Sequence, residues 1–296
     1  MSDYRLKVFL SVATHLSFTK ASHELYISQP AISKHIKELE ADFKTRLFER
    51  MGNSIALTPS GELLVEHAKQ IMAAYQQLEY AMHQLHGDCV GELRLGASTT
   101  IAQYLLPSLL ARFIELHPEV KLSLITANSR EIESAVEAQE IDLGLIEGTY
   151  KRSNMKYTFF KKDSLVAVSR VCSSRLIPDT IDVNDLANYK LILREQGSGT
   201  LDVIERALAA HNIKLNSLQI PLYLGSTESI KRFVQHTNAL GIVSRLAVQS
   251  NIDRGELKEV SLQGVEMDRE FNFVSLQGEL IGLSKVFTQF ALHYNK

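Results

Sequence analysis

The 296-residue sequence is poor in cysteine, has no tryptophan and contains no long apolar run. Its two cysteines, Cys89 and Cys172, lie far apart and predict neither a disulfide framework nor a CxxC metal site, so each is interpreted as a free thiol. No stretch approaches the roughly 18 apolar residues that span a bilayer. The N-terminal MSDYRLKVF lacks the basic start and apolar core of a signal peptide, so we expect a soluble, cytoplasmic protein without a membrane partner.

An excess of charge of either sign is also missing, since 32 Lys and Arg stand against 34 Asp and Glu. A net charge of −2 spread evenly would argue weakly against nucleic-acid binding. Residues 1–58, however, carry eight basic and six acidic residues, whereas the other 238 carry 24 and 28. A mildly basic N-terminal segment on an acidic remainder suits a protein that touches DNA through one small surface. Length and a hydrophobic content of 45% predict two or three globular units.

Residues 17–39, SFTKASHELYISQPAISKHIKEL, predict two short helices joined by a tight turn. The first helix covers about residues 18–25, with Ser17 or Thr19 as its cap. Two helices joined in this way, the second with a basic and polar face, form the helix-turn-helix pattern.

The second helix has a clear start and two distinct faces. Ser28 is a good N-cap, and Pro30 falls in the first turn, where a missing amide costs nothing. Spacings of four and three predict a buried face at Ile32, Ile36 and Leu39. Side chains that donate to base edges and phosphates lie opposite, at Gln29, Ser33, Lys34 and Lys37. The alternative is an ordinary helical hairpin with a solvated basic face.

The run S-F-T-K-A-S…L-x-I-S-Q-P-A-I-S-K-H-I-K-x-L-E…L-F-E-R closely resembles the N-terminal signature of LysR-type transcriptional regulators. The resemblance continues to the C-terminus. It implies a dimer or tetramer that binds double-stranded promoter DNA, with RNA polymerase as a further partner, and a small-molecule effector that switches it. The candidate DNA-binding residues are Ser17, Thr19, Ser28, Gln29, Pro30, Ser33, Lys34, Lys37 and Arg50.

Two flanking segments complete the predicted DNA-binding unit. A helix over residues 4–15, capped by Asp3, would pack behind the helical pair. In residues 47–57, short apolar pieces flank a Gly-Asn pair, which is hairpin chemistry, so we expect a two-stranded wing. Arg50 would lie against the phosphate backbone, unless it is a plain surface arginine. The unit is therefore expected to be a winged helix-turn-helix.

A long helix is predicted to follow. Thr58 offers a capping hydroxyl, Pro59 suits the first helical position, and no glycine or proline occurs between Gly61 and Gly87. A coiled-coil seam that would pair two chains is predicted at Leu64, Ala68, Ile71, Tyr75, Leu78, Met82 and Leu85. The alternative is an amphipathic helix that lies on its own domain. Three histidines lack paired spacing for a metal and are interpreted as surface or interface residues: His67, His83 and His86.

Beyond a hinge at residues 87–91, strands and helices alternate, which predicts an α/β body with a mostly parallel sheet. Strands are expected at residues 93–97, 120–127, 143–146, two within 157–168, near 191, 222 and 242, and at 269–276. Helices are expected at residues 100–116 with a break at Pro107, at 131–138 and at 283–293. A chain that leaves one lobe, builds a second and returns gives two lobes joined by two crossover strands, near residues 157–162 and 264–271. The resemblance implies the same two-lobed, periplasmic-binding-protein-like effector domain.

The expected domains follow from these segments. The winged helix-turn-helix occupies residues 1–58, the linker and dimerisation helix 59–90, and the effector domain 91–296. Within the last, lobe I covers about residues 91–161 and 266–296, and lobe II about 162–265.

In open α/β sheets, ligands bind beyond the carboxyl ends of strands, at helix starts. Four such junctions carry hydroxyls or small residues, which suits an anion or carboxylate. The candidate effector-binding residues are Ser98, Thr99, Thr100, Thr126, Asn128, Glu147, Ser198, Gly199, Thr200 and Thr227. Each hydroxyl could instead only cap its own helix. Glu147 could accept an ammonium or guanidinium, or repel the wrong anion.

The resemblance assigns effector contacts to Ser98, Thr100, Ser198 and Thr200. The loop Glu-Gln-Gly-Ser-Gly-Thr also resembles that of a subgroup that senses small anions. That subgroup often continues with arginine, and Leu201 stands here instead, which argues against a doubly charged effector.

Two other functions were weighed. An enzyme could use the Gly-Ser-Gly-Thr loop to cradle phosphate, but no Walker lysine, G-x-S-x-G elbow or H-E-x-x-H motif accompanies it. A solute-binding protein would fit the body but would carry a signal peptide and no DNA-reading unit. We therefore expect a regulator that is not an enzyme and has neither catalytic residues, cofactor nor metal.

Overall fold

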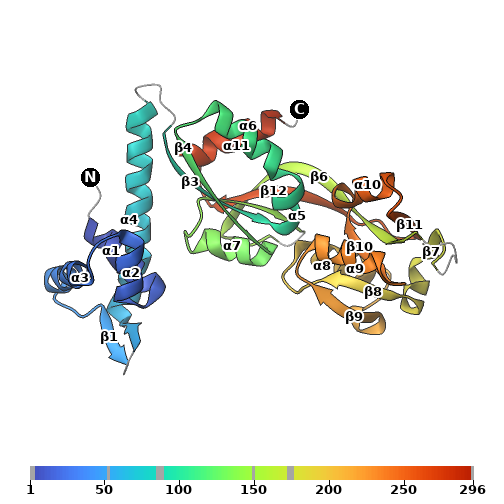
Figure 1. Cartoon of the computed structure of the whole chain (residues 1–296), viewed down its shortest axis with the longest axis horizontal. Helices are drawn as coiled ribbons and strands as arrows, with labels where there is room; N and C mark the ends of the chain where they lie inside the picture. Colours follow the sequence, from blue (N-terminus) through green and yellow to red (C-terminus); the bar gives the residue numbers. More distant parts are fainter. Residues whose placement is uncertain (1–3, 52–53, 85–89, 149–150, 172–176, 295–296) are drawn as a thin grey trace. The chain divides into compact units, whose positions relative to one another are not determined.

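A computed structural model of the chain describes residues 4–51, 54–84, 90–148, 151–171 and 177–294 (Figure 1). The chain forms two compact units, Met1–Gly91 and Glu92–Lys296. Across the described residues, no helix combines the length and hydropathy that a membrane crossing needs. The predicted cap Asp3 and the cysteines Cys89 and Cys172 lie outside the described residues.

The first unit is a winged helix-turn-helix followed by a long helix, as predicted. Its elements are α1 (Tyr4–His15), α2 (Phe18–Leu25), α3 (Gln29–Phe43), β1 (Phe48–Met51), β2 (Ser54–Leu57) and α4 (Pro59–Gln84). Strands β1 and β2 pair antiparallel as the wing. The core of the unit collects apolar side chains from all four helices, among them Phe9, Ala21, Ile32 and Ala68. Helix α2 is capped by Ser17, not Thr19, because the Ser17 Oγ accepts a hydrogen bond from the Lys20 amide at 3.3 Å.

Helix α4 begins as predicted, with the Thr58 Oγ1 accepting from the Gly61 amide at 3.0 Å. Its 26 residues extend about 39 Å at 1.5 Å per residue. The seam divides in two. Ala68 is fully buried in the core of the unit, so the alternative of packing on its own domain is correct there. Ile71 and Leu78 are 41% and 56% exposed.

The second unit is one mixed sheet that spans two lobes. Lobe I contains β3 (Gly91–Ser98), α5 (Thr99–Tyr104), α6 (Leu106–Leu116), β4 (Val120–Ala127), α7 (Ser129–Glu137), β5 (Leu143–Glu147) and α11 (Gly282–Tyr294). Figure 1 shows α6 and α11 over one face of the lobe I strands and α7 over the other. The predicted helix break is present, but it lies at Leu105, and Pro107 falls in the first turn of α6.

Lobe II is built from one continuous stretch of chain. It contains β7 (Thr180–Asp182), the 3₁₀ helix Val183–Asn188, β8 (Lys190–Arg194), α8 (Gly199–Ala209), the 3₁₀ helix Leu215–Ser217, β9 (Gln219–Leu224), α9 (Thr227–Gln235), β10 (Leu240–Ser244), α10 (Arg245–Asp253) and β11 (Leu257–Gln263). Its core includes Leu201, which is fully buried.

Two long strands, β6 (Met155–Arg170) and β12 (Asp268–Leu276), join the lobes. The strand order is β4-β3-β5-β12-β6-β10-β8-β9, with β11 beside β6 and β7 beside β11. The prediction of two strands within residues 157–168 was wrong, because β6 runs unbroken and pairs first with β12 and then with β10 and β11. The sheet is also mixed, not mostly parallel, because β6 and β12 run antiparallel to their neighbours.

Candidate functional site

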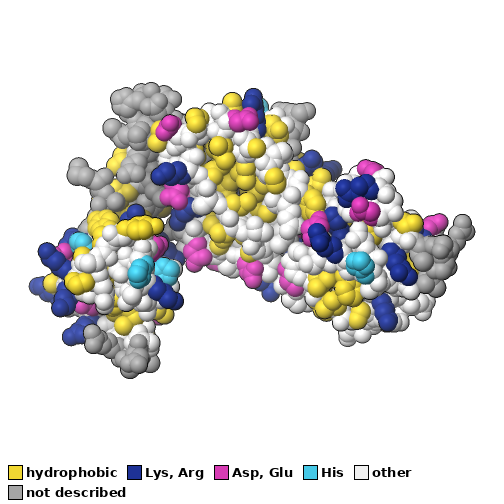
Figure 2. Space-filling model, in the orientation of Figure 1, with side chains coloured by type: hydrophobic (Ala, Val, Ile, Leu, Met, Phe, Trp, Pro, Cys, Tyr) yellow, Lys and Arg dark blue, Asp and Glu magenta, His cyan; other side chains and the backbone are white. Residues whose placement is uncertain are grey.

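Helix α3 presents two distinct faces. Ile32, Ile36 and Leu39 are buried against α1 and α2. Gln29, Lys34 and Lys37 are exposed on the outer face, and Ser33 is half-buried there. Figure 2 shows Lys and Arg side chains gathered over this part of the unit. The four residues of α3 that were predicted to contact DNA therefore share one solvent-facing surface.

The remaining predicted DNA contacts belong to α2, to the start of α3 and to the wing. The Ser28 Oγ accepts from the Ala31 amide at 3.4 Å and so caps α3, with Pro30 exposed in the first turn. Thr19 is exposed on α2. Arg50 pairs with Ile55 in the wing, but its side chain lies outside what the structure describes. Tyr26, which was not among the predicted contacts, follows α2 as its C-cap and is 95% exposed.

In the second unit, hydroxyls from both lobes meet around one buried carboxylate. Glu147 ends β5 and is only 2% exposed. Ser98 donates from its Oγ to the Glu147 carboxylate, as does Thr100 Oγ1 at 3.1 Å. From lobe II, Thr200 Oγ1 donates to the same carboxylate at 3.4 Å. Thr227 Oγ1 lies 3.4 Å from Thr100 Oγ1.

Arg269, at the start of β12, completes this arrangement, although sequence analysis did not select it. Its Nη1 lies 3.4 Å from Glu147 Oε1 and donates to Thr200 Oγ1 at 2.9 Å. Its Nε donates to Asp163 Oδ2 at 2.7 Å, and Asp163 in turn accepts from Ser244 Oγ at 2.9 Å. We call Ser98, Thr100, Glu147, Thr200, Thr227 and Arg269 the inter-lobe cluster.

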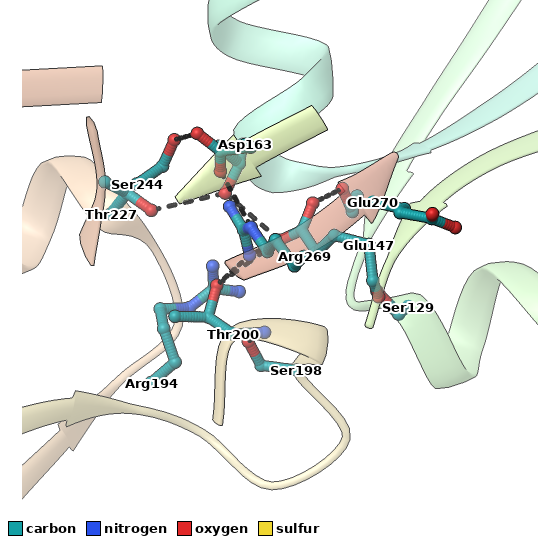
Figure 3. Close-up of polar contacts among 12 residues, drawn as sticks. Ser129, Glu147, Asp163, Arg194, Ser198, Thr200, Thr227, Ser244, Arg269 and Glu270 are labelled. Atoms are coloured by element: carbon teal, nitrogen blue, oxygen red, sulfur yellow. Dashed lines mark hydrogen bonds and ion pairs between the residues drawn. The ribbon is translucent and has the colours of Figure 1, made fainter. Parts of the chain in front are cut away.

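A second buried arginine, Arg194, ends β8 beside this cluster. Figure 3 shows its guanidinium group beside Thr200 and facing Arg269. Arg194 donates to the Glu195 carboxylate at 2.8 and 2.9 Å. Among the described residues, neither Nη1 of Arg194 nor Nη2 of Arg269 has a hydrogen-bond partner, although both atoms are buried. The signal in the sequence was an arginine at the carboxyl end of the apolar run Leu-Ile-Leu, where ligands of α/β sheets bind.

Several predicted effector contacts have local roles instead. Asn128 Oδ1 accepts from the Glu131 amide at 3.0 Å within a capping box, and the Ser198 Oγ accepts from the Thr200 amide at 3.2 Å. Thr126 is exposed on β4. Thr99 Oγ1 is buried and has no partner among the described residues. For Asn128 and Ser198, the capping alternative describes the observed contacts.

The two lobes also touch at their backbones. Gly199 packs so closely on β5 that a Cβ there would lie 1.8 Å from the Glu147 carbonyl oxygen. The Arg130 amide at the start of α7 donates to the Gly197 carbonyl at 3.2 Å. On the other side, Lys231 Nζ of α9 donates to the Tyr104 hydroxyl of α5 at 3.1 Å. Contacts on both sides of the inter-lobe cluster therefore hold the lobes together.

A cavity of about 610 Å³ opens beside Glu147, between α7 and α8. Three arginines line it, Arg130, Arg152 and Arg206, together with the carboxylates Glu133, Glu147, Asp202 and Glu205. Burial raises the pKa of the Glu133 carboxyl, and the charge of Asp202 raises it further. Burial likewise raises the pKa of Asp202 and that of the Tyr157 hydroxyl, which donates to Glu133.

No metal site was found in the part of the chain that the structure describes, because no three His, Cys, Asp or Glu side chains converge there. His67 is exposed on α4. His86 and the side chain of His83 lie outside the described part.

The fold and the two surfaces define a winged helix-turn-helix protein with a two-lobed α/β sensor unit. Residues 4–62 match the family model "Bacterial regulatory helix-turn-helix protein, lysR family", and residues 86–295 match "LysR substrate binding domain". The chain therefore belongs to the LysR family of transcriptional regulators, as the resemblance implied. It is a DNA-binding transcription regulator with an effector-binding domain.

Two relatives extend the comparison along nearly the whole chain. The HTH-type transcriptional regulator CysL of Bacillus subtilis is 30% identical over 91% of this chain and 89% of its own length. The HTH-type transcriptional regulator CbbR of Rhodospirillum rubrum is also 30% identical, over 93% and 90%. Both are transcriptional regulators.

Two solved structures share the fold. The regulatory domain of Synechocystis PCC6803 CcmR, in complex with 2-PG, is 26% identical with a TM-score of 0.62, covering 70% of this chain and 98% of that one. Full-length CbnR, complexed with its target DNA, has a TM-score of 0.67 over 99% of both chains at 20% identity.

Proposed function

We propose that this regulator binds promoter DNA through the outer face of α3 and responds to a small anionic effector bound at the inter-lobe cluster. The observation that carries the effector site is the convergence of hydroxyls from both lobes on one buried point beside two arginines. The proposal divides the chain into a DNA-binding domain at 1–58, a linker at 59–90 and an effector domain at 91–296. RNA polymerase is included as the partner that the promoter-bound protein would contact.

The DNA contacts are proposed by chemistry. Gln29 and Ser33 lie on the outer face of α3 and can pair with base edges in the major groove. Lys34, Lys37 and Arg50 would neutralise phosphates, which sets affinity and salt dependence more than sequence preference. The starts of α2 and α3 would lie closest to the sugar-phosphate backbone of the DNA. Ser17 and Thr19 are at the first of these starts, and Ser28 and Pro30 are at the second.

Dimerisation is proposed through the outer part of α4. Ala68 is committed to its own unit, but the exposed Ile71 and Leu78 repeat at seven residues and offer an apolar stripe. An exposed stripe of this kind is buried when two helices pair. Pairing would place two reading helices at a fixed separation on a two-fold DNA site.

An anionic effector is supported by the charges around the cluster. Arg194 and Arg269 are fully buried, and the helices α5 and α8 begin there with Ser98 and Ser198 at their N-caps. Free amides at helix starts favour negative charge. CcmR, a relative in fold and sequence, was solved in complex with 2-PG. An effector that contacts both lobes stabilises the arrangement of the lobes to which it binds more tightly. It would thereby shift the equilibrium between conformations of the DNA-bound regulator.

The proposal is tested first by a gel shift on the DNA upstream of this protein's own gene, over a salt series. We expect a shift that survives non-specific competitor and that small carboxylates or oxyanions alter. Absence of a shift on that DNA and on genomic fragments would contradict the regulatory part of the proposal.

Two variants then separate the two halves of the function. Ser98→Ala and Thr200→Ala each remove a hydroxyl from the inter-lobe cluster, at a cost of about 1–3 kcal/mol to effector binding. We expect a weaker effector response with unchanged DNA affinity, measured by the same gel shift. Ser217→Ala, at the exposed end of the 3₁₀ helix Leu215–Ser217 where its hydroxyl donates to the Lys214 carbonyl, is the control. Loss of DNA binding in a folded Ser98 or Thr200 variant would contradict the proposed division.

A further inference from the structure

Glu147 fills the position in the inter-lobe cluster that an anion would occupy. Its carboxylate accepts from Ser98, Thr100 and Thr200 and pairs with Arg269. These donors come from both lobes and from the strand that joins them. The protein's own carboxylate is therefore one of the groups that bridge the lobes (Figure 3).

The balance of buried charges makes it unfavourable for a second anion to bind beside Glu147. Glu147 and Asp163 are both buried and share one cation, Arg269. Arg194 is already matched by Glu195. Adding a further negative charge to a buried group that already carries an excess of one is strongly unfavourable. An anion can enter at low cost only if the carboxylate of Glu147 leaves, which keeps the total charge constant.

The same site contains donors that Glu147 does not satisfy. Nη1 of Arg194 and Nη2 of Arg269 are buried without a partner among the described residues. A buried N–H with no acceptor costs roughly 1–3 kcal/mol, more when it is charged. A free anion can take a position between the two guanidinium groups that the tethered carboxylate does not reach. This difference supplies a reason for exchange.

The displaced side chain has a place to go. Glu147 lines the 610 Å³ cavity between α7 and α8, whose wall also carries Arg130 and Arg206. Both arginines are exposed, so rotation of Glu147 into the cavity would bring its carboxylate from buried partners toward solvated basic ones.

We propose that Glu147 is a resident counter-ion that exchanges with the effector. An incoming carboxylate or small oxyanion takes over the hydroxyls of Ser98, Thr100 and Thr200 and both arginines, while Glu147 turns into the cavity toward Arg130 and Arg206. The inference rests on the proposed effector site, and it adds that the free protein is held together by an anion of its own. Effector binding is then a replacement and not a filling of an empty site.

The first test is chemical rescue of full-length Glu147→Ala, followed by thermal unfolding. Removing the carboxylate leaves buried donors unsatisfied, so we expect a lower Tm than in the unchanged protein. Sodium acetate or sodium nitrate, whose anions carry one charge like the lost carboxylate, should then raise the Tm of this variant several degrees more than that of the unchanged protein, with sodium chloride at equal ionic strength as the reference. Acetate and nitrate distinguish a carboxylate effector from an inorganic oxyanion.

The matched control is Glu259→Ala, which breaks an exposed pair with Arg245 at 2.6 Å on lobe II. Its response to both salts should equal that of the unchanged protein, because general salt effects act on all variants alike. Equal responses of all three proteins to both anions would overturn the proposal.

The second test does not depend on how Glu147→Ala folds. Glu147→Gln keeps the shape, removes the charge and replaces one acceptor oxygen with an NH₂ donor, so calorimetry should find acetate or nitrate bound at least tenfold more tightly than by the unchanged protein. Adding Arg269→Gln should abolish that gain. A Glu147→Gln protein that binds both anions no more tightly would refute exchange. Neither test uses DNA, so the gel shift can fail or succeed independently of them.

Discussion

At the scale of single residues, Tyr26 is the clearest departure from what stability alone would select. It ends α2 in the left-handed conformation, with φ 54° and ψ 37°, and its side chain is 95% exposed. A side chain with a Cβ pays about 1–2 kcal/mol for that conformation, which is why glycine usually occupies it. Tyrosine gains no burial in return, and it lies one turn before the reading helix.

We expect Tyr26→Gly to raise the free energy of unfolding of the first unit by up to about 1 kcal/mol, since relief of the left-handed strain exceeds the added flexibility of the unfolded chain. Urea denaturation of the full-length protein measures this. Tyr26→Phe keeps both ring and strain and should leave stability unchanged. A less stable glycine variant would mean that the ring makes a contact of its own.

Individual site residues could be predicted where the neighbouring sequence indicates a strand followed by a helix. Ser98, Thr100, Thr200 and Thr227 follow strands at helix starts, and the structure brings all four to one place. Arg194 and Arg269 were missed because β8 and β12 are far apart in sequence, and only the folded sheet carries them to the end of β5. Whether these residues hold an effector stays a prediction.

At the scale of elements, the start of α8 is the joint between the lobes. Gly199 begins this helix, and its Cα faces the Glu147 backbone without space for a side chain. Asp202, one turn on, faces the cavity opposite Glu133 of α7. Packing and charge at this joint act in opposite directions, because the backbones fit closely while the two carboxylates repel.

We expect Gly199→Ala to force α8 away from β5, since the added Cβ would lie 1.8 Å from a backbone oxygen that no rotamer can move. Overpacking of this kind costs about 1–3 kcal/mol. Thermal unfolding should show a lowered Tm, together with a weakened response to anions. Gly225→Ala meets nothing within 4 Å and should behave as the unchanged protein. Equal melting of the two variants would place the joint elsewhere.

The raised pKa of Asp202 predicts a pH dependence of stability. Because burial raises its folded-state pKa above 3.8, its contribution to stability is fully present below that value and is lost as pH rises through the folded pKa. Asp202→Asn should therefore stabilise the protein at neutral pH and flatten the fall in stability on the alkaline side of pH 3.8. Denaturation curves across that range measure it, with exposed Asp253→Asn as control. A steeper fall in Asp202→Asn would show that its charge is favourable.

At the scale of the whole molecule, the sequence predicted two kinds of unit but not the strand order and pairing of the second. The helices of the first unit have short, local signals in caps and spacings, so their bounds were predicted closely. Strand β6 was divided in two because nothing in residues 157–168 shows that one strand serves both lobes. Its partners lie far along the chain, β10 more than 70 residues away and β12 more than 100, and their order cannot be derived from a local pattern.

Assembly of the whole molecule is predicted to depend on the outer part of α4. Leu78→Lys places a charge on the exposed apolar stripe, which would be buried in the dimer. We therefore expect the dissociation constant of the dimer to rise, as measured by sedimentation velocity over a concentration series. Gln70→Lys adds the same charge at an exposed position off the stripe and should not alter assembly. An unchanged dimer in Leu78→Lys would assign pairing to another surface.

The strand order of the sheet also determines the order in which the parts of a newly synthesised chain can fold. The first unit is complete by Gln84, and most of lobe II lies between β6 and β11. Lobe I, by contrast, begins at β3 but needs β12 and α11 to cover its strands. On the ribosome, β5 must therefore remain without its partner strand β12 for about 120 residues, because β5 ends at Glu147 and β12 begins at Asp268. The lobe that is translated first is the one that folds last.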